Sequence, residues 1–242
     1  MREPIPSSAL LADIPKFTGF PESGEKFLAG LAKHNEKRWF DAHRDEYERG
    51  LLQPMRGFVL AVGERLAKTV PGVVADPRVG GSIFRMARDI RFSKDKSPYK
   101  TWCAARLWVG SVKELAPSFY VHVGHDGAYA GGGIYGFEDD QLARWRAALS
   151  DAKQRAALAA ALKKAKGLEV GGQHYKRVPK GFAPDHPAAE LLKHRGLYAG
   201  ADLDAKRLRT TKAVDEAVAV YLRLAPTIAW LRRNISEGAR VG

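Results

Sequence analysis

The sequence contains a single cysteine, Cys103, among 242 residues. One thiol excludes an intramolecular disulfide and any zinc or iron–sulfur site that needs several cysteines. The seven histidines include no HxxxH pair, so the sequence indicates no metal site, and no cofactor is expected. No apolar run approaches the roughly 20 residues of a membrane-spanning helix, and the proline-interrupted N-terminal stretch is too weakly apolar for a signal peptide. We therefore expect a cytoplasmic protein with no membrane partner.

Acidic residues are scarce relative to basic ones. Asp and Glu number 27 against 40 Lys and Arg, which gives a formal charge of +13 at pH 7. This excess predicts affinity for anions, such as nucleic acids, phosphorylated metabolites or an anionic surface. With 45% hydrophobic and 28% charged residues, the composition is that of a folded globular protein and excludes wholesale disorder.

Apolar residues recur at helical spacing near both ends of the chain. The segments predicted to be helical are 22–33, 40–47, 52–66, 139–150, 153–166, 214–221 and the stretch after Pro226. Residues 171–187, rich in Gly, Pro, His and basic side chains, are expected to be irregular.

The middle of the chain changes to the two-residue period of β-strands. The predicted strands are 83–92, 101–109, 118–123 and 127–134. Their short connections favour antiparallel pairing. We expect an α+β fold, in which an antiparallel sheet of about four or more strands is packed by N-terminal and C-terminal helices. Residues 17–238 are predicted to form one α+β domain, preceded by a flexible arm, residues 1–16.

The segment from Arg85 to Arg106 carries the densest charge. Seven basic and two acidic side chains give it a net charge of +5 over 22 residues. In a hairpin, residues 93–100 would form the connecting loop, and Asp89 would share a strand face with Arg85 and Arg91. A carboxylate so placed can orient a guanidinium for bidentate binding of phosphate or carboxylate. The candidate ligand-binding residues here are Arg85, Arg88, Asp89, Arg91, Lys96, Tyr99, Lys100 and Arg106.

A simpler interpretation of the same segment remains open. In this interpretation the hairpin exposes its charges to solvent while the Arg and Lys stems cover an apolar sheet face. Arg88 argues against this, because it interrupts the apolar face and must be paired or face a cavity.

Two further groups of residues are candidates for chemistry. Tyr120 and His122 alternate on one strand face, where a phenol beside an imidazole offers an acid/base pair, although the pattern favours the simpler interpretation of a half-buried histidine bonded to a neighbour. Lys176 and Arg177 lie in a basic segment with aromatic neighbours that would suit a nucleotide or simply form a surface loop. The glycines at 131–133 would form an anion nest or a tight strand exit.

Several motifs together resemble one known family. They are Phe17–Pro21, Arg38–Phe40, His43–Tyr47, Ile83–Arg85, Arg88–Asp89, Arg91–Lys96 and Pro98–Thr101, with the Tyr120/His122 strand, the glycine run, Tyr175–Arg177 and His186–Pro187. The chain resembles a conserved-hypothetical family of bacterial and fungal proteins, a domain of unknown function. Two positions depart from its pattern: Ala87, where Tyr is usual, and Trp102, where His is usual. The resemblance implies no particular activity, cofactor or substrate.

Three functions remain open on this basis. The first is the binding, or enzymatic conversion, of a phosphorylated or otherwise anionic small molecule. The second is a nucleic-acid-binding module that uses the basic hairpin and residues 175–177. The third is a structural or interaction protein whose charge maintains solubility. We favour the first, because cations interleaved with Asp89 suit a defined pocket and no aromatic stacking pairs or nucleic-acid motif are evident.

Overall fold

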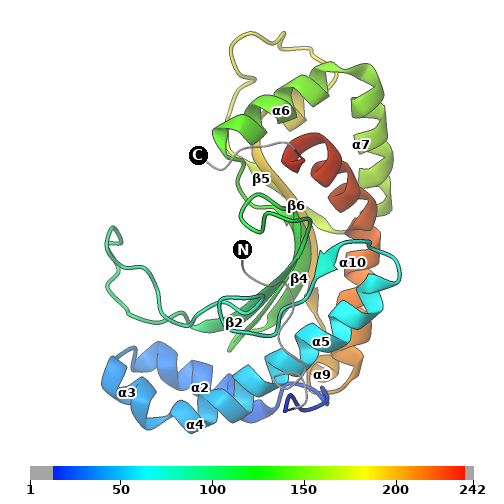
Figure 1. The fold of residues 1–242 in the computed structure, drawn as a ribbon. Coiled ribbons are helices and arrows are strands. Elements are labelled where there is room, and N and C mark those ends of the chain that lie inside the picture. The colour runs from blue at the N-terminus through cyan, green and yellow to red at the C-terminus, as the bar shows by residue number, and fades with distance from the viewer. Residues whose placement is uncertain (1–12, 238–242) are drawn as a thin grey trace.

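A curved six-stranded sheet is the centre of the molecule. The computed structural model describes residues 13–237. Residues 1–12 of the arm predicted over 1–16 therefore lie outside the described part. In the described remainder of that arm, the Pro15 carbonyl lies close to Gly57 of α5. Helices cover the convex face of the sheet (Figure 1). The strand order is β1-β2-β3-β4-β6-β5, with every neighbouring pair antiparallel. The strands are β1 (Val73–Val74), β2 (Trp102–Val109), β3 (Ser118–Gly124), β4 (Ala128–Ile134), β5 (Glu169–Gln173) and β6 (His194–Leu203).

Helices precede, interrupt and follow the strands. The N-terminal group is α2 (Glu22–Lys33), α3 (Lys37–Ala42), α4 (Arg44–Tyr47), the π-helical η1 (Glu48–Leu52) and α5 (Gln53–Ala67). The later ones are α6 (Asp139–Ser150), α7 (Ala152–Lys164), α8 (Ala189–Leu192), α9 (Ala205–Leu208), α10 (Lys212–Leu231) and the π-helical η2 (Arg232–Ser236). The predicted α+β class, with an antiparallel sheet packed by helices from both ends of the chain, is confirmed.

The main core lies between the convex face of the sheet and helices α2, α5 and α10. α5 packs against β1 and β2, whereas α10 packs against β3, β4 and β6. Alternate residues of each strand point into this core, as Cys103 and Leu107 do on β2 and Phe119 does on β3. The intervening residues therefore point to the concave face, where the described helices do not cover them (Figure 1).

A second apolar cluster lies at the other end of the molecule. Trp145 of α6 is fully buried there and packs edge-on against Trp230 of α10. Because α10 contributes to both clusters, this helix connects the two ends of the structure.

Two expectations about secondary structure in the C-terminal half were wrong, and strand β6 was not predicted. Segments 169–173 and 194–203 form strands β5 and β6, the first of them overlapping the stretch expected to be irregular. The two helices expected on either side of Pro226 are one helix, α10. The missing amide of Pro226 would have bonded the carbonyl of Leu222. Leu222 is 43% exposed, so this turn of α10 lies on the solvent side of the helix.

Candidate functional site

The basic segment forms an arm between β1 and β2 that projects beyond the sheet (Figure 1). Ser82 and Phe84 still pair with β2: the Arg106 amide donates to the Ser82 carbonyl, and the Phe84 amide to the Ala104 carbonyl, both at 2.9 Å. Beyond Phe84 the chain leaves the sheet, so the strand predicted over 83–92 was wrong and only isolated bridges remain.

Backbone and lysine side-chain hydrogen bonds hold the arm together. The Arg88 amide donates to the Pro98 carbonyl and the Lys100 amide to the Met86 carbonyl, both at 2.8 Å. The Lys100 ammonium donates to the Arg85 carbonyl at 2.6 Å and to the Ala87 carbonyl at 3.0 Å. Lys96 binds the Ile90 carbonyl at 3.0 Å.

Both acidic side chains of the arm form ion pairs with its arginines. The Arg88 guanidinium is paired with Asp95 and donates to the Ser97 carbonyl at 3.0 Å. Arg91 donates to both carboxylate oxygens of Asp89, at 3.0 and 2.7 Å, and this lowers the Asp89 pKa. Asp89 thus orients Arg91, as expected, but on the exposed surface. Neither pair lines either of the two cavities described below, and a ligand role for Arg88, Asp89, Arg91 and Lys96 stays a prediction.

A cavity of about 360 Å³ opens where the base of the arm meets β2. Its cationic side chains come from three parts of the chain: Arg85 and Lys100 from the arm, Arg106 from β2 and Lys113 from the β2–β3 connection. No carboxylate lines it. The predicted cluster of cations is therefore divided, since only Arg85, Lys100 and Arg106 of the candidates face this shared space.

The cations of this cavity are partly withdrawn from water. Burial lowers the pKa values of Arg106, Lys100 and Lys113, because desolvation disfavours their charged forms. Lys113 donates to the carbonyls of Gly80, at 2.6 Å, and Gly81. The Arg106 guanidinium has no hydrogen bond or salt bridge to any residue of the described range 13–237. Its carbon lies 6.0 Å from the centroid of the Phe84 ring.

An aromatic row extends from the cavity across the concave face of the sheet. The centroid of the Phe84 ring is 6.2 Å from that of Tyr120 on β3, and the Tyr120 centroid is 5.8 Å from that of His122. His122 is 5.8 Å from Tyr129 on β4, with the rings nearly parallel. Trp102 of β2 flanks the row 6.3 Å from His122.

Tyr120 and His122 are both uncharged at neutral pH. Burial raises the pKa of Tyr120 to about 12. Burial also lowers the pKa of His122, and the carboxylates of Asp126 and Asp202 oppose this shift only in part. The pair offers neutral hydrogen-bonding groups on the concave face; its predicted catalytic role is not tested by the geometry.

The glycine run lies in β4 under these rings. A Cβ atom at Gly131 would approach the Tyr129 hydroxyl to 2.8 Å and the Ala199 carbonyl to 2.7 Å. Of the three, only Gly133 has a positive φ, +143°. The run therefore forms extended strand that leaves room for Tyr129 to lie across it, rather than a turn.

The remaining candidates lie away from the cavity. The Tyr99 ring stacks on Phe40 at 4.3 Å, and its amide donates to Asn35, which ties the arm to the N-terminal helices. Lys176 and Arg177 are exposed and follow β5, at the sheet edge opposite β1. The structure does not bring these residues together with Arg106.

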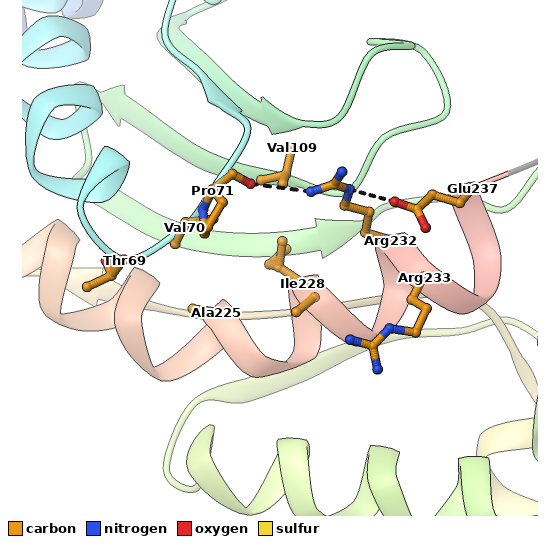
Figure 2. A pocket seen from close by; sticks show the side chains of 10 residues that line it. Thr69, Val70, Pro71, Val109, Ala225, Ile228, Arg232, Arg233 and Glu237 are labelled. Carbon is orange, nitrogen blue, oxygen red and sulfur yellow. Dashed lines mark hydrogen bonds and ion pairs between the residues drawn. The ribbon is translucent and has the colours of Figure 1, made fainter.

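A second cavity, of about 300 Å³, lies on the other side of β2, beside the end of α10 (Figure 2). Its Arg232 forms an ion pair with Glu237 at 2.9 Å and donates to the Pro71 carbonyl at 3.3 Å. Figure 2 shows Arg233 directed away from this pair. Arg232 is neutralised by Glu237 and holds the helix end against the chain before β1. Arg233, which also lines the cavity, is exposed to solvent.

Comparison with known families agrees with this architecture. A family model described as a conserved hypothetical protein, DUF2461, matches residues 24–230. The chain belongs to this family. The resemblance expected from the sequence motifs is thereby confirmed at the level of the family. Neither the curated proteins nor the solved structures gave a significant match.

Sequence reasoning on this DUF2461 protein missed part of the site. Lys113 stands outside the basic segment, and Phe84, Trp102 and Tyr129 were not singled out as site residues. One signal was available: Trp102, Arg106 and Trp108 alternate on one face of β2 against buried apolar residues. In residues 13–237 no group of three His, Cys, Asp or Glu could hold a metal ion, and no helix there combines the length and apolar character needed to cross a membrane.

Proposed function

We propose that this DUF2461 domain binds a phosphate-bearing small molecule in the cavity lined by Arg85, Lys100, Arg106 and Lys113. The observation that carries the proposal is the half-buried Arg106 guanidinium, which has no hydrogen-bonding partner within residues 13–237. A desolvated, unpaired cation costs free energy, and a bound anion offsets that cost.

The geometry of the cavity suits such a ligand. A guanidinium presents two parallel N–H donors to a phosphate, whereas lysines act as compact point charges. The volume of about 360 Å³ lies within the range of small-molecule sites. The lysines are held in place by backbone carbonyls, so binding an anion there requires little additional ordering.

A continuous basic stripe for a nucleic-acid backbone has less support. Arg88 and Arg91 are paired with carboxylates of the arm, and Lys176 lies at the opposite edge of the sheet. A small anion in one cavity therefore accounts better for the way these charges are arranged.

Thermal unfolding with inorganic pyrophosphate at constant ionic strength tests the proposal. We expect pyrophosphate to raise the Tm of the wild type, and Arg106→Gln to weaken its apparent affinity roughly 10- to 100-fold, as expected for the loss of a charged hydrogen-bonding partner. Arg49→Gln, which removes an 84%-exposed arginine from η1, is the matched control and should behave as the wild type. Equal affinities in all three proteins, or no shift at millimolar pyrophosphate, would overturn the proposal.

A further inference from the structure

The aromatic row has polar edges that no described residue satisfies. Within residues 13–237, the Trp102 indole N–H, the Tyr120 hydroxyl and the His122 ring nitrogens form no hydrogen bonds. All three side chains are half-buried on the concave face, next to the unpaired Arg106. Half-buried polar groups in folded proteins usually have hydrogen-bond partners. Aromatic packing on the sheet face does not explain why four neighbouring polar side chains lack them.

The charge on this face changes sign from one side to the other. Arg106, Lys100 and Lys113 stand at the β2 side. Asp202 of β6 is the cross-strand partner of Tyr129, and Glu169 of β5 is opposite Gly200, so both carboxylates lie on the concave side. β2 and β6 are separated by three strand spacings of about 4.8 Å, or about 14 Å. Half-buried aromatic rings occupy the space between the charges.

We propose that the ligand is a mononucleotide, with its phosphate at Arg106 and its base on the aromatic row formed by Trp102, Tyr120, His122 and Tyr129. This inference rests on the proposed function. Stacking on aromatic rings tolerates any base, because every base has a π-face. Asp202 and Glu169 would accept hydrogen bonds from sugar hydroxyls or an exocyclic amine, as carboxylates do in nucleotide recognition.

The same carboxylates distinguish a mononucleotide from a single-stranded nucleic acid. A strand crossing the sheet would carry its next phosphates past Asp202 and Glu169, where like charges repel. Its backbone needs cations along the whole path, whereas within residues 13–237 the cations that line the cavity on this face stand at the β2 side. The observations therefore favour one phosphate group and one base.

The experiment compares adenosine 5′-monophosphate with ribose 5-phosphate by isothermal titration calorimetry. We expect the nucleotide to bind the wild type roughly tenfold more tightly or better, the gain expected of one stacked base. Trp102→Leu should reduce this preference while leaving ribose 5-phosphate affinity unchanged, and Arg106→Gln should weaken both ligands. Phe92→Leu, which removes a 93%-exposed aromatic from the arm, is the control and should retain the preference.

Each outcome separates this inference from the proposed function. Equal binding of the two phosphates in the wild type, with both weakened by Arg106→Gln, would overturn the nucleotide and leave the anion site intact. Failure of both to bind would overturn the anion site as well. A ten-nucleotide single strand that binds more than tenfold tighter than the mononucleotide would replace the inference with nucleic-acid binding. Should Trp102→Leu not fold, Tyr129→Leu makes the same comparison, with the same loss of preference expected.

Discussion

Arg106 on β2 and Tyr120 on β3 lie directly opposite each other, and neither side chain has a hydrogen-bond partner within the described residues. The guanidinium is partly buried and its pKa is lowered by that burial. The Arg106 guanidinium and the Tyr120 hydroxyl therefore contribute no hydrogen bond to the stability of the described structure. Such an arrangement is typical of binding sites, where function is favoured over stability.

Replacing Arg106 by an apolar side chain should not destabilise the unliganded protein. We expect Arg106→Met to leave the free energy of unfolding unchanged or to raise it by up to about 1 kcal/mol, because an uncompensated cation is removed and its apolar stem is kept. Urea unfolding of the two proteins in phosphate-free buffer measures this. A loss well beyond about 1 kcal/mol would show that Arg106 has a structural role.

The arm depends on Arg88 in a different way. In Arg88→Ala the bonds to Asp95 and to the Ser97 carbonyl are lost, and we expect the arm to open locally while the core stays folded. The Arg88 amide donates to the Pro98 carbonyl, and the Ser97 amide donates to the Asp95 carboxylate. Hydrogen exchange should accelerate at both amides. Unchanged exchange at both amides would contradict this role, and amides of β3 serve as the internal control.

Much of the architecture was predictable because local patterns were strong. The helices around Phe27 and Phe58 and the strands β2 to β4 follow clear apolar periodicity. β6 was missed because its buried face includes small residues such as Ala199 and its other face includes Gly196 and Gly200, so the alternation in hydrophobicity is weak. The continuation of α10 through Pro226 depends on the exposure of one turn, which the sequence does not show.

The candidate site was only partly predictable for a similar reason. The sequence shows that basic side chains are concentrated in residues 85–106. Whether a given cation binds a carboxylate of the arm or faces a cavity depends on the path of the arm, which the sequence does not show. Arg91 and Arg106 look alike in the sequence, whereas in the structure Asp89 neutralises the first and nothing described pairs with the second. Lys113 lines the same cavity as Arg106 because the β2–β3 connection carries it there.

His122 makes a pH-dependent contribution to stability. Its pKa is lowered in the folded state, mainly by burial, from the ordinary value near 6.5. The unfolded chain therefore binds a proton that the native histidine resists, so stability is lost as the pH falls through about 6.5. We expect the difference in unfolding free energy between pH 7.5 and 5.5 to shrink in His122→Phe. His194, whose pKa is also lowered, retains part of the dependence; an identical difference in the variant would contradict the prediction.

Gly171 and Tyr198 form a close pair between β5 and β6. A Cβ atom at Gly171 would collide with the Tyr198 ring and contacts no backbone at such short range. Gly171→Ala should therefore cost about 1–3 kcal/mol, the usual cost of overpacking. In a Tyr198→Ala background the same change should cost little, and urea unfolding of the double-mutant cycle measures the coupling. Additive effects would show that the strain lies in the backbone.

The most direct test of the anion site is the position of a heavy oxyanion in a crystal. In crystals soaked with tungstate, anomalous scattering locates the ion without prior assumptions. The account predicts a peak in the cavity within hydrogen-bonding distance of Arg106 and Lys113. Peaks confined to the exposed arm or to Lys176 and Arg177, with none beside Arg106, would contradict it.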